Sequence, residues 1–362
     1  MSAKMVSGEN LDTLKARNRV QSLFEWRTGV TEPKSLPRAV FVELTQGCNL
    51  KCPMCRSYHI RPSQRRMSDQ VFEAVSRELF PAAELVDLRG WGESLILPDI
   101  AKRIDAVAEY QAKLRVVSNF SFNRDNVLDQ LAEVKAIVDV SIDTACPETL
   151  MRVRGGAKLD LIERNLRYLL QKGRMQGNVC LLVTIQRETI AHLPALVDFA
   201  ARVGVQRMRL FPVTVGEGSP LALSGLDQQI DCALSEATTR AKANHIRLEA
   251  GGRLGTIDGD MGDNPCIHPW SYCYISYRGD IGFCDHLIGA GNESYLVGNI
   301  IDDDFGLVWR GPNMTTLRLE HLNARRAAAP LFAHCAWCYK NKFTDFEDVF
   351  APEARASQVV LA

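Results

Sequence analysis

The chain alternates short runs of β-branched and other apolar residues with longer stretches in which apolar positions recur every three or four residues. Runs of the first kind are typical of buried strands, and spacing of the second kind is typical of helices with one apolar face. The expected strands are Ala39–Thr45, Leu85–Arg89, Leu114–Ser118, Val138–Ile142, Cys180–Ile185 and Met208–Val213. Three of the helical faces comprise Val71, Ala74, Val75 and Leu79; Leu161, Ile162, Leu166 and Leu169; and Leu193, Leu196, Val197 and Ala200. This repeated order predicts an α/β fold with a parallel sheet.

Six strand–helix units are fewer than the eight that close a TIM barrel, so the pattern alone leaves an open sheet and a partial barrel as alternatives. The pattern ends at Gly216–Gly225, which is rich in Gly, Ser and Pro. Helices are also expected at Leu11–Trp26 and Asp227–Ala243. We divide the chain into residues 1–36 (N-terminal extension), 37–215 (strand–helix domain), 216–263 (linker and bridging helix), 264–345 (small C-terminal domain) and 346–362 (C-terminal tail). The end of this tail, from Pro352, is expected to be frayed.

The 362 residues are 46% hydrophobic and 24% charged, with a formal net charge of zero. This balance gives no electrostatic reason to expect nucleic acid or membrane binding, and it favours a small or neutral partner. The first ten residues are polar, so no signal peptide is visible, and no apolar run reaches the roughly 18 residues of a membrane span. We therefore expect a cytoplasmic protein whose eleven cysteines are metal ligands or catalytic thiols rather than disulfides.

A loop with three closely spaced cysteines directly follows the first expected strand: Cys48-Asn-Leu-Lys-Cys52-Pro-Met-Cys55. Three thiolates on one tight loop can hold three irons of a cubane cluster and leave the fourth iron open to chemistry. A zinc site usually needs a fourth Cys or His, and a disulfide would leave one thiol over. The preceding strand and a second cysteine group near the C-terminus favour the cluster.

That second group comprises Cys266, Cys273, Cys284, Cys335 and Cys338. Cys335-Ala-Trp-Cys338 is a C-x2-C pair of the type that binds a metal centre. The centre is either an iron–sulfur cluster or a zinc ion that also uses a nearby histidine. The histidine candidates are His268, His286 and His334. Cys273 either lies near a substrate cavity or is a buried small hydrophobe.

The C-x3-C-x2-C spacing resembles the signature of the radical S-adenosylmethionine (radical SAM) enzymes. The resemblance implies a partial (β/α)6 TIM-like barrel and a [4Fe–4S] cluster on Cys48, Cys52 and Cys55, whose fourth iron is chelated by SAM. Reductive cleavage of SAM then gives a 5′-deoxyadenosyl radical, which abstracts a substrate hydrogen. The resemblance also implies an electron donor such as a flavodoxin or ferredoxin. Basic residues around the loop are either a solvated face or its docking surface; they are Lys51, Arg56, Arg61, Arg65 and Arg66.

The C-terminal segment resembles the opening of the SPASM extension of radical SAM enzymes. The matching pattern is Cys266-x12-Gly279-x4-Cys284 followed by Cys335-x2-Cys338, and the later cysteines of a complete SPASM domain are missing. What remains is similar to the shortened version called the twitch domain. The resemblance implies a second, auxiliary [4Fe–4S] cluster, with Cys266, Cys284, Cys335 and Cys338 as its ligands.

Other segments resemble SAM-binding motifs of the family, and they lie at the C-terminal ends of expected strands, where ligands bind in such folds. Arg89–Ser94 resembles the GGE motif, whose glycines let backbone atoms meet the amino group of SAM, although a plain turn is the alternative. Ser141–Asp143, Pro147–Thr149 and Arg154–Gly156 resemble the SIDG, PE and RGG elements of SPASM and twitch enzymes. The implied SAM contacts are Gly90, Gly92, Glu93, Ser118, Asn119, Ser141, Asp143 and Arg154.

The resemblance extends to twitch enzymes of antibiotic biosynthesis such as 2-deoxy-scyllo-inosamine dehydrogenase. It implies that a secondary alcohol carbon of an aminocyclitol or sugar is oxidised to a ketone, with the auxiliary cluster as electron acceptor. One alternative is epimerisation, for which Cys273 is the first catalytic candidate as hydrogen donor, ahead of Cys180 and Cys146. Another is modification of a ribosomal peptide, although the extension of 35 residues is too short for the winged-helix domain that such enzymes often carry. A metal-stapled binding protein would not explain a three-cysteine loop that lacks one ligand.

Overall fold

The computed structural model describes residues 10–55, 58–60, 63–173, 175–216, 218–251, 265–284, 295–323, 335 and 358–360. The strands are β1 Ala39–Val42, β2 Leu85–Asp87, β3 Lys113–Ser118, β4 Ile137–Ser141, β5 Val179–Ile185, β6 Arg207–Pro212, β7 Arg247–Gly251, β8 Tyr272–Ile275, β9 Asp280–Gly282, β10 Gly298–Asn299 and β11 Gln358–Val360. The helices are α1 Leu11–Thr28, α2 Asp69–Leu79, α3 Ile100–Glu109, α4 Asp125–Glu133, α5 Pro147–Val153, α6 Leu159–Gln171, α7 Leu193–Val203, α8 Asp227–Ala243, α9 His268–Ser271, α10 Phe305–Trp309 and α11 Pro312–Leu322. Short 3-10 helices lie at Tyr58–Ile60, Ser94–Ile96, Gln176–Asn178 and Ile190–His192.

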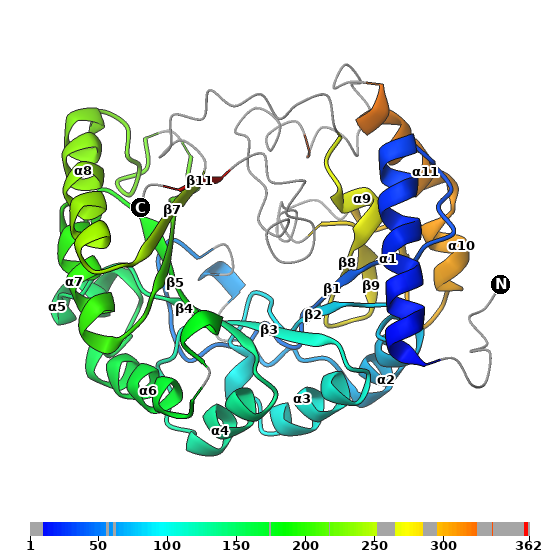
Figure 1. Ribbon diagram of the computed structural model, residues 1–362, viewed down its shortest axis with the longest axis horizontal. Coiled ribbons are helices and arrows are strands. Elements are labelled where there is room, and N and C mark those ends of the chain that lie inside the picture. The colour runs from blue at the N-terminus through cyan, green and yellow to red at the C-terminus, as the bar shows by residue number, and fades with distance from the viewer. Residues whose placement is uncertain are drawn as a thin grey trace.

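These strands form one sheet in the order β10-β9-β8-β1-β2-β3-β4-β5-β6-β7-β11. Strands β1 to β7 pair in parallel in chain order, and β8 joins the other edge of β1, also in parallel. Helices α2 to α8 form an arc around the outside of this curved sheet (Figure 1). The fold is therefore the expected partial (β/α)6 barrel, whose six strand–helix units are followed by a further parallel strand.

Five strands, β7 to β11, were not expected from the sequence. Strand β7 follows α8 and pairs in parallel with β6, so the strand–helix order continues past residue 215. Strand β11 lies in the tail that was expected to be frayed, and it pairs antiparallel with β7. Polar residues alternate with apolar ones in Arg247-Leu-Glu-Ala-Gly, a pattern typical of a strand, but the run has only five residues and lies inside a segment that reads as a linker.

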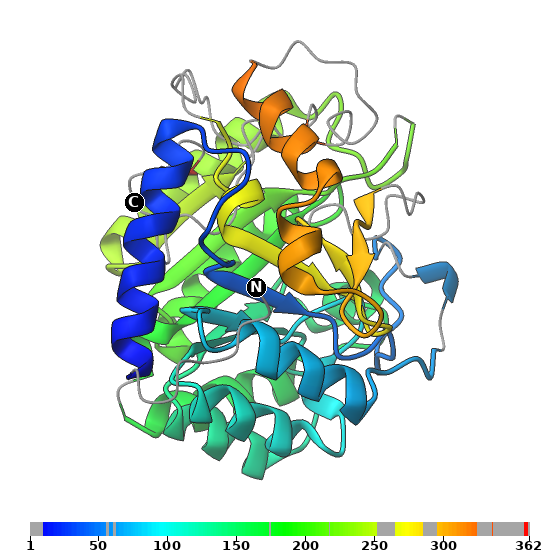
Figure 2. The same cartoon turned by 90° about the vertical axis from the view of Figure 1, so that its right-hand side faces the viewer.

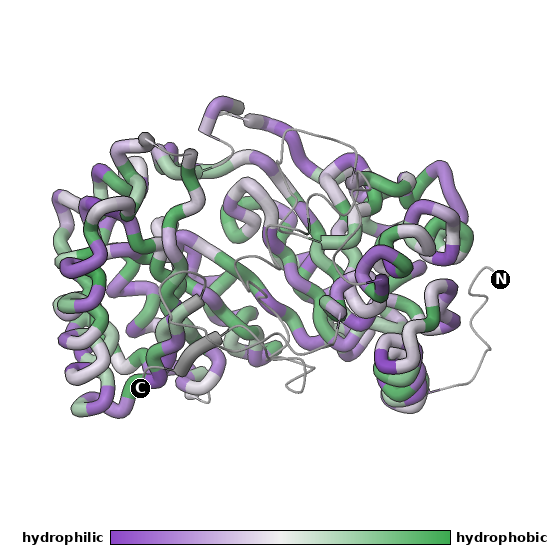
Figure 3. Tube along the Cα trace, turned by 90° about the horizontal axis from the view of Figure 1, so that it is seen from above, coloured by the Kyte–Doolittle hydropathy of each residue, from purple (hydrophilic) through white to green (hydrophobic). Residues whose placement is uncertain are grey.

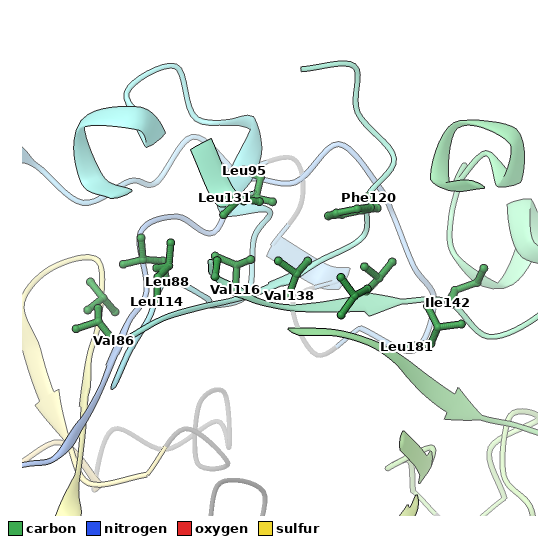
Figure 4. Packing of buried hydrophobic residues seen from close by; sticks show 14 of the residues in the cluster. Val86, Leu88, Leu95, Leu114, Val116, Phe120, Leu131, Val138, Ile142 and Leu181 are labelled. Carbon is green, nitrogen blue, oxygen red and sulfur yellow. The ribbon is translucent and has the colours of Figure 1, made fainter. Parts of the chain in front are cut away.

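The outer face of the sheet carries the hydrophobic core. Successive side chains of a strand point to opposite faces, and in Figure 4 Val86, Val116 and Val138 point from their strands toward the covering helices. These side chains are fully buried. In Figure 3 the helices show hydrophobic (green) and hydrophilic (purple) segments in turn along each coil, as expected for helices with one buried face. Among the described residues, no helix is long and apolar enough to cross a membrane.

The inner face of the sheet is charged and aromatic. Arg115 Nε donates a 2.6 Å hydrogen bond to Asp139 Oδ2, and Asp87 Oδ2 lies 3.8 Å from the Arg115 guanidinium on the other side. Further along the sheet, Arg209 Nε lies 2.9 Å from Glu249 Oε2. All five side chains are buried, and charges at such depth persist only when they are paired. The barrel interior is therefore a polar surface made by alternate residues of the strands.

The N-terminal helix α1 stands beside α9 of the C-terminal domain (Figures 1 and 2). Lys15 Nζ donates a 2.5 Å hydrogen bond to the carbonyl of Ala83, which precedes β2. At the other end of α1, Trp26 packs with Ile267 and Trp270. The N-terminal segment thus packs on the barrel and also connects it to the C-terminal domain.

Candidate radical SAM site

The three-cysteine loop lies at the C-terminal end of β1, and its thiols are half-buried. Burial raises the pKa of the Cys52 thiol to about 11; the positive charge of Arg154 opposes this rise, and nearby Cys55 and Cys48 add to it. The three thiols are therefore close enough to influence one another's charge, and a guanidinium faces them. This donor set fits a cluster that is bound through three cysteines.

In the described ranges, no group of three or more His, Cys, Asp and Glu side chains is placed to hold a single metal ion. A cubane binds each cysteine to a separate iron, so its ligands need not converge on one point. The arrangement at the loop is thus compatible with a cluster.

The Arg89–Ser94 loop packs against the start of the cysteine loop. Gly92 N donates a 3.0 Å hydrogen bond to the carbonyl of Thr45, and Glu93 N donates one of 2.8 Å to the carbonyl of Gly47. A Cβ atom on Gly92 would lie 2.2 Å from the Gly47 oxygen. Glycine is therefore needed because two loops meet here, in addition to the role in SAM binding that the motif implies.

Glu93 joins this loop to the end of β3. Its buried carboxylate accepts hydrogen bonds from Ser118 Oγ at 2.9 Å, from Asn119 N at 2.7 Å and from Leu95 N at 3.2 Å. The structure thus brings together three of the residues that the motifs indicated. Each of these contacts is within the chain, so Glu93 acts first as an internal brace of the candidate SAM site.

The braced segment also reaches the cysteine loop through Asn49. Asn119 Nδ2 donates a 2.9 Å hydrogen bond to Asn49 Oδ1 and lies 3.7 Å from Cys48 Sγ. Asn49 Nδ2 in turn donates to the carbonyl of Ser121 at 2.6 Å. Sequence reasoning missed Asn49, although its place beside Cys48 in the motif was a signal that could have found it.

A buried ion pair supports the other side of the cysteine loop. Arg154 Nε and Nη2 donate hydrogen bonds of 2.6 and 2.5 Å to the two oxygens of Asp143, whose Oδ1 also accepts from Thr184 N at 2.8 Å. Ser141, the last residue of β4, is half-buried near them in sequence. The bidentate pair fixes the guanidinium on the side of the site where Cys52 lies.

Gly155 follows this arginine and contacts the cysteine loop directly. Lys51 N donates a 3.0 Å hydrogen bond to its carbonyl, its φ is +51°, and a Cβ there would lie 2.1 Å from the Lys51 carbonyl carbon. We expect Gly155→Ala to displace the loop and to lower the iron content of the purified protein.

Gly173→Ala is the matched control, because Gly173 has a φ of +66° and nothing within 4 Å of its would-be Cβ. Both variants bear the left-handed backbone strain, on the order of 1–3 kcal/mol, but only Gly155→Ala overlaps the loop. Equal iron content in the two variants would show that the close approach at Gly155 is unimportant for cluster binding.

Glu43 is a second residue that sequence reasoning missed. Its Oε1 accepts a 3.3 Å hydrogen bond from Trp91 N, and its Oε2 accepts one of 3.4 Å from Tyr277 N. Burial raises the pKa of this carboxyl, while hydrogen bonds, the largest from the Tyr274 side chain, act in the opposite direction. One carboxyl group thus joins β1, the candidate SAM loop and the β8–β9 turn of the C-terminal domain. Its charge, in an otherwise largely apolar run that leads into the cysteine loop, was the available signal.

The auxiliary ligands implied by the SPASM resemblance are described in part. Cys266 precedes α9 and is half-buried, Cys284 follows β9 and is buried, and Cys335 is half-buried. Cys338 lies outside the described residues, as do His286 and His334. Of the three histidines proposed as zinc ligands, His268 is described, and its Nδ1 lies 3.2 Å from Cys284 Sγ.

Cys273 lies on the helix-facing side of the sheet. It is fully buried in the same hydrophobic cluster as its strand partner Val40, whereas the adjacent Tyr272 and Tyr274 belong to a cluster on the opposite face. Burial raises the pKa of its thiol strongly. This position favours the interpretation of Cys273 as a buried small hydrophobe and removes the reason to expect it to donate hydrogen to a substrate inside the barrel.

Cys180 and Cys146, the other two candidates for hydrogen donation, lie in different surroundings from Cys273. Cys180 is buried on the inner face, at the N-terminal end of β5, and burial raises its thiol pKa to about 12. In the strand register it lies opposite Asp139 of β4. Cys146 caps α5 and donates a 3.3 Å hydrogen bond to Glu148.

The basic residues around the cysteine loop are exposed where they are described, at Lys51, Arg65 and Arg66. Arg56 and Arg61 lie outside the described residues. Both earlier interpretations of this face, a solvated surface and a docking surface for an electron donor, stay predictions.

Comparison with protein families finds two domains. The Radical SAM superfamily profile matches residues 42–200, and the SPASM iron–sulfur cluster-binding domain profile matches residues 266–339. The first match contains the cysteine loop, the Glu93 brace and the Asp143–Arg154 pair. The second contains all five cysteines of the C-terminal group.

Curated proteins similar in sequence include two of stated role. A tungsten-containing aldehyde ferredoxin oxidoreductase cofactor-modifying protein of Pyrococcus furiosus is 24% identical over 196 residues, which are 51% of this chain and 55% of that protein. The mycofactocin maturase MftC of Mycobacterium tuberculosis is 25% identical over 283 residues, which are 75% of this chain and 70% of the maturase.

Similar solved structures share the fold at low sequence identity. SuiB of Streptococcus suis bound to S-adenosylmethionine has a TM-score of 0.63 at 16% identity, over 87% of this chain and 73% of that one. anSMEcpe with bound AdoMet and a peptide has a TM-score of 0.62 at 14% identity, over 90% of this chain and 93% of that one. Both superpose over the barrel and beyond it, so the similarity extends to most of the architecture described above.

Proposed function

Because this chain is a radical SAM protein with a C-terminal SPASM iron–sulfur domain, we propose that it oxidises its substrate by removing a hydrogen atom and then an electron. When bound, SAM and its cluster supply the adenosyl radical, and the auxiliary cluster supplies a one-electron acceptor. The chain's own residues hold these groups at one mouth of the barrel. Cys48, Cys52 and Cys55 would bind the first cluster, and the Glu93 brace and the Asp143–Arg154 pair would orient SAM.

The observation that carries the proposal is the position of the C-terminal domain. Strand β8 extends the barrel sheet beside β1, and Glu43 accepts hydrogen bonds from both Trp91 in the candidate SAM loop and Tyr277 in the β8–β9 turn. The C-terminal domain, which would carry the electron acceptor, thus shares a sheet with the barrel where hydrogen abstraction would occur. Proximity of this kind supports one-electron oxidation of the substrate radical over simple hydrogen return.

For the substrate we propose a secondary alcohol carbon of an aminocyclitol or sugar, of the kind found in antibiotic biosynthesis. Loss of the carbon-bound hydrogen atom, the hydroxyl proton and one further electron converts the alcohol to a ketone. The inner face of the barrel supports a polar ring as substrate, because it combines ion pairs such as Arg115–Asp139 and Arg209–Glu249 with aromatic side chains such as Phe41.

A peptide substrate is the second candidate, and a specific observation favours it. The similarity to the mycofactocin maturase extends over 75% of this chain, which is more than the barrel alone, and SuiB and anSMEcpe, which share the fold, are known with bound peptides. Epimerisation was favoured by Cys273 as a hydrogen donor, but this thiol lies on the helix-facing side of the sheet and so does not support it.

The test is an anaerobic assay of reconstituted protein with SAM, a reducing system and either aminocyclitols and sugars or peptides. We expect 5′-deoxyadenosine to form above the substrate-free background and the product to weigh two hydrogens less than the substrate. A substrate deuterated at the carbinol carbon should transfer deuterium to 5′-deoxyadenosine. Turnover with peptides alone would establish the second candidate, and a product of unchanged mass would contradict oxidation for either substrate class.

A further inference from the structure

The auxiliary site contains a histidine that contacts a presumed cluster ligand. His268 is buried at the start of α9, and its Nδ1 lies 3.2 Å from Cys284 Sγ. A cysteine that ligates iron is a thiolate, and a thiolate sulfur can only accept a hydrogen bond. Nδ1 must therefore carry the proton whenever Cys284 is a ligand.

The imidazole is held in this orientation by an aromatic stack. Its ring lies 3.9 Å from the ring of Tyr272, with an angle of 21° between the planes, and Tyr272 is in turn stacked on Phe41 at 5.4 Å. Both Tyr272 and Phe41 belong to the cluster of residues on the inner face of the barrel. The stack thus fixes His268 from the inner face of the barrel and leaves Nδ1 directed at the sulfur.

Resting on the proposed oxidation, we infer that His268 tunes the auxiliary cluster by donating an N–H···S hydrogen bond to Cys284. A hydrogen bond to a ligand sulfur stabilises the additional negative charge of the reduced cluster and so raises its reduction potential. Burial strengthens this effect, because a hydrogen bond is electrostatically stronger in the low local dielectric of the protein interior than in water. His268 would in this way make the auxiliary cluster a better acceptor for an electron from the barrel interior.

The experiment measures the potential of the auxiliary cluster alone. In full-length protein carrying Cys48→Ala, Cys52→Ala and Cys55→Ala, the remaining iron belongs to the C-terminal site, and its midpoint potential can be followed by EPR without substrate or SAM. We expect His268→Phe, which keeps an aromatic ring beside Tyr272, to retain the iron and to lower the midpoint potential. His268→Asn, whose amide nitrogen can replace Nδ1 as a donor, should restore the potential toward that of the parent.

Three results would overturn the inference. An unchanged potential in an iron-replete His268→Phe variant would show that the contact does not tune the cluster. Loss of iron from both His268 variants would make His268 a ligand or a structural support instead. Zinc in place of iron in the parent would remove the cluster itself, and with it the proposed electron acceptor, whereas the first two results leave that function intact.

Discussion

Replacing Cys48, Cys52 and Cys55 together by alanine is expected to abolish SAM cleavage and to halve the iron content, from about eight to about four atoms per chain. The physical reason is that the three thiols are the protein ligands available on this loop, and the Glu93 and Asp143 braces around it offer no replacement ligand for the vacated irons. Iron and sulfide analysis, together with Mössbauer spectra of the parent and the triple variant, would measure the loss.

The matched control removes cysteines that lie outside both groups. Cys146 and Cys232 are half-buried and exposed, respectively, so a Cys146→Ala, Cys232→Ala variant should retain all its iron and its SAM cleavage. A triple variant that kept its full iron content would disprove the assignment of the loop. One that lost all its iron would show that the two sites depend on each other for stability.

The second large effect is expected for Arg154→Ala. The change leaves the Asp143 carboxylate buried without its bidentate partner, and breaking a buried ion pair in this way costs about 3–5 kcal/mol in the free energy of unfolding. It also removes the positive charge that opposes the rise in the Cys52 pKa, so cluster binding should weaken. Chemical denaturation and iron content of the same samples measure the two effects.

Two further variants make this result specific. Arg152 lies in the last turn of α5, two residues before Arg154, and its side chain is 61% exposed in its pair with Glu188, so Arg152→Ala should change little. Arg154→Lys retains the charge but not the planar two-point contact, and it should lie between the parent and Arg154→Ala. If Arg152→Ala and Arg154→Ala lowered the free energy of unfolding equally, the buried Asp143–Arg154 pair would contribute no more to stability than an exposed pair.

The sequence predicted the repeating part of the fold and the positions of the cysteine loops. Helices such as α2 and α6 have a clear helical period of apolar residues, and local periodicity is visible in one sequence. Strand β7 was missed because its alternating run is short and its pairing with β6 is not visible in the local sequence.

The candidate site was predicted residue by residue only where a motif covered it. The motif residues Glu93, Ser118 and Asn119 contact one another, and Asp143 pairs with Arg154. The roles of Glu43 and Asn49 and the contact of His268 with Cys284 were missed, because each depends on segments that are far apart in the chain. The interior ion pairs were missed for the same reason, since each charge taken alone is an interruption of an apolar strand.

The pairing of β8 with β1 also bears on how the protein is made. During synthesis, β1 emerges early, whereas the strand that covers its outer edge, where Ala39 meets Tyr272, emerges only near the end of the chain. Until then, that edge presents unpaired backbone groups and the aromatic ring of Phe41, which is the kind of surface that promotes aggregation of nascent chains. Such long-range parallel pairing also slows folding. Low-temperature expression with chaperones should therefore improve the yield of soluble protein more than a larger supply of iron alone.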